Sequence, residues 1–148
     1  MTRDERGSIA PAAPIIAMAL LLLGGLGIDG SRQLNARGEA VAFAEEAARA
    51  GAQGIDVSAS DLELDPALAE ERVNTYCDRV EQLGQVKSCR FLRIQAVSDS
   101  DPRQLVVVTE VKLEIDASLL SMIPGVDHLS ASATAHARPY EGINAPTS

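Results

Sequence analysis

The sequence is poor in aromatic side chains and in basic residues. Tryptophan is absent, and Phe and Tyr together make up 3% of the 148 residues. The core must therefore be built from Val, Leu, Ile and many Ala, whose small size allows neighbouring backbones to approach closely. The 13 basic residues are outnumbered by 21 acidic ones, giving a formal net charge of -8. This charge disfavours nucleic acid as a partner, because such binding depends on basic groups that displace phosphate counterions.

Sequence patterns that support catalysis or cofactor binding are also lacking. No nucleophile has a base at a usable spacing, and the one glycine-rich stretch lies within an apolar run instead of following a strand. Zinc is disfavoured because the two cysteines and the distant His128 and His136 lack the paired spacing of a structural site. We therefore expect a non-enzymatic protein with no cofactor and no metal.

One long uncharged run lies near the N-terminus, from Ile9 to Ile28. At 1.5 Å per residue it matches a hydrocarbon core of roughly 30 Å, which predicts a transmembrane helix. The alternatives are a buried globular helix and a cleavable secretory signal. Asp4 and Glu5 offset the arginines that precede the run, and Asp29 follows it, so that a signal cleavage site is poorly supported. An uncleaved signal anchor is favoured.

Helical periodicity continues beyond the apolar run. Apolar residues, nearly all of them Ala, recur at alternating steps of four and three and form one stripe, made of Ala36, Ala40, Phe43, Ala47 and Ala50. This stripe predicts a helical extension over residues 29–54 that a sheet or another helix can approach closely. Packing on the chain's own domain is favoured over an intermolecular coiled coil, because two heptads are few.

The polar residues and glycines of this extension predict where the helix meets water, where it can bend and where it ends. Asp29 and the residues directly after it are expected to reach water at the end of the membrane run. Gly30 and Gly38 weaken a helix by roughly 1 kcal/mol each relative to Ala and would permit a bend at the membrane surface. Gly51 and Gly54 are expected to end the helix.

A second helix and three strands are expected to follow a linker over residues 55–64. Asp65-Pro66 provides an N-cap and a proline at the first helical position, and Gly84 provides the stop. Alternating apolar and polar residues predict strands around 89–97, 105–115 and 129–137. The fold class is therefore α+β, with a long N-terminal helix that is transmembrane and then amphipathic, a second helix and a small three-stranded antiparallel sheet. The alanine face of the last strand is expected to pack on the alanine stripe.

The only two cysteines, Cys77 and Cys89, would close a short loop between the second helix and the next strand. A disulfide there would stabilise the fold by about 3 kcal/mol and would persist in an oxidising compartment. A pair of ordinary buried thiols is the alternative, since spacing does not fix pairing. A bridge would place the domain on the extracytoplasmic side.

An apolar loop separates the second and third strands. Its candidate contact residues are Leu119, Leu120, Met122 and Ile123, and Pro124-Gly125 follows them. The loop either plugs one end of the core, which is slightly favoured, or forms an exposed tip that touches lipid or a partner subunit.

Both ends of the chain carry a resemblance to a known family. The opening Glu5-Arg6-Gly7-Ser8-Ile9-Ala10-Pro11, with the apolar helix ending Gly27-Ile28-Asp29, resembles the start of TadE/TadG-like proteins of the bacterial tight-adherence (Flp) pilus apparatus. Ile123-Pro124-Gly125 and the strand from Ser130 to Arg138 are similar to the end of such proteins. The resemblance implies a minor pilin, pseudopilin or assembly component that is held in the membrane with a small sheet domain outside it.

The resemblance also bears on processing. Pilin-like members are cut after a Gly and carry Glu five residues into the mature chain. A cut between Gly7 and Ser8 would place Ala12 there instead, and the missing carboxylate could not neutralise a neighbouring subunit's amino terminus in lipid. A permanently anchored component is therefore favoured over a filament subunit.

Together with the apolar run, the resemblance implies a membrane-anchored minor pilin-like or pseudopilin-like component of Flp pilus assembly in the bacterial cell membrane. Its expected partners are membrane lipid and other pilus or secretion-platform proteins, in a homo- or hetero-oligomer. The alternative is a membrane-tethered module that binds or senses an extracellular ligand and is unrelated to pili. The expected divisions are a cytoplasmic N-terminus over 1–8, the membrane helix over 9–28, its extension over 29–54, an α+β domain over 55–140 and a tail over 141–148.

Overall fold

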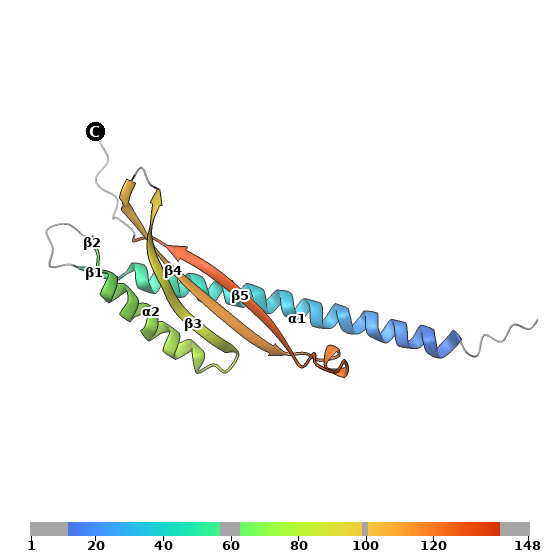
Figure 1. The fold of residues 1–148 in the computed structure, drawn as a ribbon. Coiled ribbons are helices and arrows are strands. Elements are labelled where there is room, and N and C mark those ends of the chain that lie inside the picture. The colour runs from blue at the N-terminus through green and yellow to red at the C-terminus, as the bar shows by residue number, and fades with distance from the viewer. Residues whose placement is uncertain (1–11, 57–62, 99–100, 140–148) are drawn as a thin grey trace, which may run out of the picture.

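The computed structural model describes residues 12–56, 63–98 and 101–139 (Figure 1). The elements in chain order are α1 (Ala12–Ala52), β1 (Ile55–Asp56), β2 (Glu63–Leu64), α2 (Pro66–Glu81), β3 (Val86–Ser98), β4 (Asp101–Asp116), the 3-10 helix η1 (Leu120–Met122) and β5 (His128–Ala137). The predicted α+β class, with a long apolar N-terminal helix, a second helix and a three-stranded antiparallel sheet, is confirmed.

Helix α1 runs without interruption for 41 residues. Its first half projects beyond the rest of the molecule, and its second half lies along the sheet (Figure 1). Gly30 and Gly38, which would permit a bend, both lie inside the continuous helix and do not interrupt it. The helical extension therefore continues directly from the apolar segment.

The main sheet has the order β3-β4-β5, and both pairs are antiparallel. Strand β4 is central, with Val111 opposite Cys89 on one side and Ala133 on the other. Its pairing with β5 has no irregularity from Val107 to Asp116, whereas the pairing with β3 contains three register shifts. The short β1–β2 pair occupies the expected linker, and the alternation in the sequence did not predict it.

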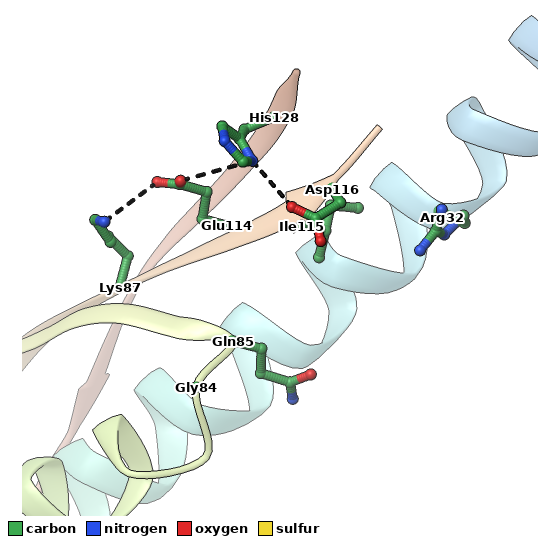
Figure 2. A pocket seen from close by; sticks show the side chains of 8 residues that line it. All are labelled: Arg32, Gly84, Gln85, Lys87, Glu114, Ile115, Asp116 and His128. Atoms are coloured by element: carbon green, nitrogen blue, oxygen red, sulfur yellow. Dashed lines mark hydrogen bonds and ion pairs between the residues drawn. The ribbon is translucent and has the colours of Figure 1, made fainter. Parts of the chain in front are cut away.

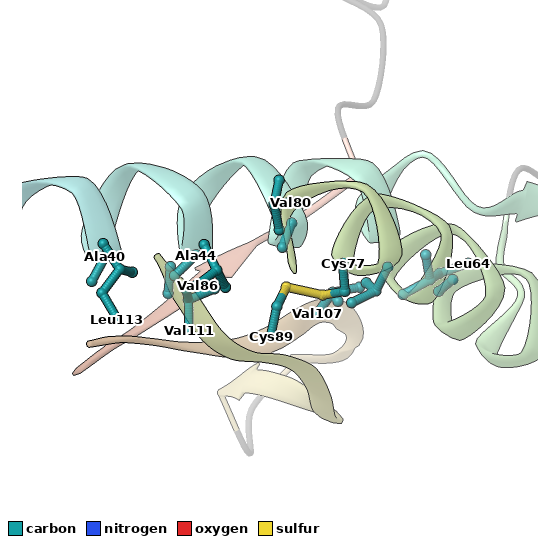
Figure 3. Close-up of a cluster of buried hydrophobic side chains, with 14 residues drawn as sticks. Ala40, Ala44, Leu64, Cys77, Val80, Val86, Cys89, Val107, Val111 and Leu113 are labelled. Carbon is teal, nitrogen blue, oxygen red and sulfur yellow. A yellow bond between two sulfur atoms is a disulfide. The ribbon is translucent and has the colours of Figure 1, made fainter. Parts of the chain in front are cut away.

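Helices α1 and α2 pack on the same face of the sheet and form a two-layer domain (Figure 3). Val107, Val111 and Leu113 have no exposed surface and lie beneath the helices. In the second half of α1 most buried residues are three or four positions apart, and two pairs are adjacent; these residues are Ala36, Ala40, Ala44, Ala47, Ala48, Gly51 and Ala52. The expected packing of small residues is therefore present, but it includes Ala44, while Phe43 lies at the edge of the core.

Thr109 of β4 makes a direct polar contact between the sheet and α1. Its hydroxyl donates a hydrogen bond of 2.7 Å to the carbonyl oxygen of Ala44, and its side chain is fully buried. A hydroxyl can reach a helix carbonyl only where the helix carries small side chains, so this contact depends on the alanine stripe.

Gly51 and Gly54 allow close packing where α1, α2 and β4 meet. A Cβ at Gly51 would lie 2.7 Å from Cγ2 of Val73 and 2.8 Å from Cγ1 of Val107. At Gly54 it would lie 2.5 Å from the backbone nitrogen of Ala69. The helix ends at Ala52, close to the predicted end, but Gly51 is a helical residue. These glycines are needed because side chains there would collide with α2.

The sequence correctly predicts both the start of helix α2 and its covalent link to the sheet. The carboxylate of Asp65 accepts the backbone N–H groups of Ala67 and Leu68, which confirms the N-cap. The disulfide between Cys77 and Cys89 joins α2 to β3, with a Cα–Cα distance of 5.1 Å (Figure 3). The disulfide expectation is therefore confirmed, and the alternative of two free thiols is wrong.

Candidate functional site

The first half of α1 exposes apolar side chains all around its axis. Its large apolar residues from Ile15 to Ile28 are 51 to 72% exposed. A surface of this size is unfavourable in water and suits a lipid environment. It is the one helix among the described residues that is long and apolar enough to cross a membrane, and it fits a single-pass anchor. Between positions 13 and 28, only Gly25 is buried.

Asp29 lies directly after this apolar run and binds the loop between β4 and β5. Its two carboxylate oxygens accept the backbone N–H groups of Ser118 at 3.0 Å, Leu119 at 2.9 Å and Leu120 at 2.7 Å. Its side chain has no exposed surface. The expectation that Asp29 reaches water is therefore wrong, because the loop covers the carboxylate and replaces its water with N–H donors.

These hydrogen bonds favour the charged form of Asp29. The N–H of Leu120 is the largest influence and lowers the pKa of this carboxyl, with smaller contributions in the same direction from Ser118, Leu119 and the charge of Arg32. Burial acts in the opposite direction but does not prevail. Asp29 is therefore held ionised at neutral pH, and a carboxylate in this state can accept all three donors.

Two further contacts fix the loop to α1 on either side of Asp29. Leu119 covers Gly25, where an added Cβ would lie only 2.8 Å from the Cβ of Leu119. The guanidinium of Arg32 donates a hydrogen bond to the hydroxyl of Ser118. The loop thus spans about two turns of α1 and extends from the polar side of Asp29 into the apolar run.

The candidate contact residues of this loop lie outside the domain core. Met122 is 81% exposed, Ile123 is 43% exposed and Leu119 is 38% exposed, while Leu120 is partly buried. None of the four belongs to the core between the sheet and the helices. The favoured interpretation of the loop as a core plug is therefore wrong, and the exposed tip describes its geometry.

A second feature of α1 is an open face on the side away from the sheet. Gly24, Gly27 and Gly38 have no heavy atom within 4 Å of where a Cβ would be placed. Leu34 is 71% exposed. At 3.6 residues per turn, these four residues lie on the side of α1 that faces away from the buried stripe. We call them the open face of α1.

The charged groove shown in Figure 2 lies where β3, β4, β5 and α1 come together. It has a volume of about 400 Å³. The Nδ1 atom of His128 lies 3.0 Å from Asp116 and 3.9 Å from Glu114, and Lys87 lies 3.9 Å from Glu114. These are exposed surface pairs, which contribute little to stability. Among the residues that the structure describes, no group of His, Cys, Asp and Glu is arranged to hold a metal ion.

The remaining predicted site residues, Gly7 and Ser8, lie outside the described residues. The site that sequence reasoning missed is the Asp29 contact with the loop. One signal could have indicated it. An acidic residue directly follows an apolar helix, and a loop of ten uncharged residues, 117–126, supplies N–H groups in need of an acceptor.

The match to known proteins falls on the helix that carries these features. Comparison with curated proteins and with solved structures gave no match. Residues 7–54, which include all of α1, match the family model described as "Putative Flp pilus-assembly TadE/G-like", and this confirms the TadE/TadG-like resemblance found in the sequence.

Proposed function

We propose that the chain is a permanently anchored, minor pilin-like component of Flp pilus assembly that acts through contacts with other proteins. The observation that carries this proposal is the construction of α1. One side of the helix holds the chain's own domain, while the opposite side stays open from the apolar segment into the domain region. The family description of residues 7–54 supports the pilus context.

The glycines of the open face support helix packing with a partner. Each glycine in a helix interior costs roughly 1 kcal/mol relative to Ala. Gly51 is explained by contacts within the domain, but Gly24, Gly27 and Gly38 meet nothing there. Small residues allow helices to approach closely in a membrane, where packing drives association. A partner helix along this face would account for all three.

The proposal places residues 1–8 in the cytoplasm, 9–28 in the membrane and the remainder outside. The Cys77–Cys89 disulfide supports this orientation, since such bonds persist in oxidising compartments. Residues 29–54 would then carry the open face into the extracytoplasmic space, where residues 55–140 form the domain and 141–148 the tail. Other pilus or secretion-platform proteins are the partners.

Site-specific crosslinking tests this function. A photoreactive amino acid would replace Leu34 on the open face in cells that express the complete pilus apparatus. The matched control replaces Leu83, which lies two residues after the end of α2 and is 60% exposed. We expect the Leu34 variant to crosslink to another pilus component, identified by mass spectrometry, and the Leu83 variant to give little product.

A crosslink to pilus components that is equally strong from both positions would show no preference for the open face. Absence of any pilus component from the Leu34 products would contradict the proposal and favour the ligand-binding or sensing module. Mass spectrometry of the same purified chain tests the anchor's permanence, because a native chain that begins at Ser8 would show that it is processed.

A further inference from the structure

The loop from Ala117 to Val126, which we call the tip loop, is uncharged and lies beside the apolar part of α1. We propose that the tip loop inserts into the boundary between headgroups and acyl chains of the outer leaflet, as a second membrane contact beside the anchor. The inference rests on the proposed membrane anchor and adds a lipid-binding surface to it.

The position of the tip loop follows from its contacts. Leu119 packs on Gly25, which lies four residues and therefore about 6 Å along the helix on the membrane side of Asp29. Leu26 and Ile28, on the same segment of α1, are 58% and 51% exposed. A bilayer that surrounds residues 9–28 therefore reaches the level of Leu119.

The exposed side chains of the tip loop are apolar, as the boundary between headgroups and acyl chains requires. Met122, at 81% exposed, and Ile123 extend the apolar surface that α1 already presents. Figure 1 shows η1 beside α1, at the end of the sheet nearer the apolar segment. The helix and the loop thus expose one type of surface next to each other, and lipid is the occupant that covers both.

The backbone of the tip loop is also prepared for a medium with little water. A polar group left unpaired in lipid costs several kcal/mol, so irregular backbone at this depth needs internal partners. Asp29 accepts three of the loop's N–H groups. The N–H groups of Met122, Ile123 and Val126 donate to backbone oxygens within the loop, and the N–H of Ala117 donates to the carbonyl oxygen of Asp127 directly after it. Pro124 has no N–H to satisfy.

The absence of charge in the tip loop determines which property of a membrane would favour its insertion. Between Asp116 and Asp127 there is no charged residue, so attraction to anionic headgroups contributes nothing within the loop. Burial of Leu119, Met122 and Ile123 supplies the driving force. Insertion should therefore depend weakly on salt and on the fraction of anionic lipid.

A single introduced tryptophan tests the proposal, because the natural chain contains none. The full chain with Met122→Trp would be reconstituted in phosphatidylcholine vesicles. The matched control is Val97→Trp, at a position 52% exposed near the β3–β4 hairpin, at the opposite end of the sheet. We expect emission from Met122→Trp to be blue-shifted relative to the control. We also expect several-fold stronger quenching by brominated phosphatidylcholine, unchanged between low and high salt.

Equal quenching of both variants by a water-soluble quencher, without quenching of Met122→Trp by brominated lipid, would overturn the inference. A blue shift that grows with the ratio of protein to lipid, again without bromine quenching, would also overturn it and assign the loop to a second copy of the chain. Alkaline extraction of the same vesicles reports the anchor independently. A chain that resists extraction while Met122→Trp stays in water would reject the loop contact and leave the anchor intact.

Discussion

The carboxylate of Asp29 accepts the backbone N–H of Leu120 at 2.7 Å, across 91 positions of sequence. The hydrogen bond joins the polar end of the apolar segment to the loop between the last two strands. The domain is thus tied to α1 at the proposed membrane boundary as well as along the alanine stripe. Predictions about stability at this boundary follow from the charge of Asp29.

The first prediction concerns the stability of the folded chain at acidic pH. The pKa of Asp29 is lowered in the folded chain by the N–H of Leu120 and its neighbours, so the unfolded chain binds this proton more readily. The stability that the carboxylate contributes is therefore fully present above about pH 5 and is lost as the pH falls toward the lower folded pKa. The thermal midpoint of the full chain in neutral detergent should fall between pH 5 and pH 3.

The control for this prediction is Asp29→Asn, which removes the titrating group. Its midpoint should be lower than that of the natural chain at pH 7, because a neutral amide offers one acceptor oxygen to three donors. The two midpoints should converge as the solution becomes acidic. Parallel pH curves for the two chains would contradict the assigned role of Asp29.

A second prediction uses two glycines of α1 that have opposite surroundings. Gly51→Ala should destabilise the domain by about 1 to 3 kcal/mol, because the new methyl group would collide with Val73 and Val107. Gly38→Ala meets nothing within 4 Å and should stabilise the helix by up to about 1 kcal/mol. Denaturant unfolding of the two variants gives both values, and changes of the same sign would refute the close packing of Gly51 against Val73 and Val107.

The third prediction concerns the alanine stripe. Ala47 is fully buried beneath the sheet, so Ala47→Phe should overpack the contact and reduce the unfolding free energy by about 1 to 3 kcal/mol. Ala42 lies on an exposed part of the same helix, and Ala42→Phe should change stability little. Equal losses for the two variants in thermal unfolding would show that bulk on the helix matters regardless of the side it occupies.

The fourth prediction concerns the bridge between α2 and β3. Replacing Cys77 and Cys89 together by Ser should cost about 3 kcal/mol of stability, because the reduced chain has more unfolded conformations. A thiol-reactive polymer added to denatured protein from intact cells should shift its gel mobility only after reduction. Free thiols without reduction would argue against an oxidising location for the domain.

The sequence predicted those helices and strands whose patterns depend only on residues close together in the chain. The Asp65-Pro66 start and the alternating strands depend on neighbours in the chain and were placed correctly, and the part of the uncharged run that the structure describes is helical. Burial of Asp29 and the tight packing at Gly51 depend on partners distant in sequence. A stripe read as a heptad also missed Ala44, because this straight helix buries residues at steps close to its own period of 3.6.

The candidate site was partly predictable for the same reason. The apolar loop residues were identified from composition, since an uncharged stretch of this length between two strands is unusual. Their exposure was not, because it depends on Leu119 packing against Gly25 instead of entering the core. Composition shows that a loop is apolar, and only tertiary contacts decide which side of a helix it occupies.

The uninterrupted course of α1 has a mechanical consequence. A helix of 41 residues without a hinge behaves as a single rod, and the sheet is fastened to one side of it. In the proposed anchored state, a torque that a neighbouring protein applies to the first half of this rod would therefore turn the sheet and α2 by the same angle. Rotation of the anchor would be transmitted to the domain without any change of shape within it.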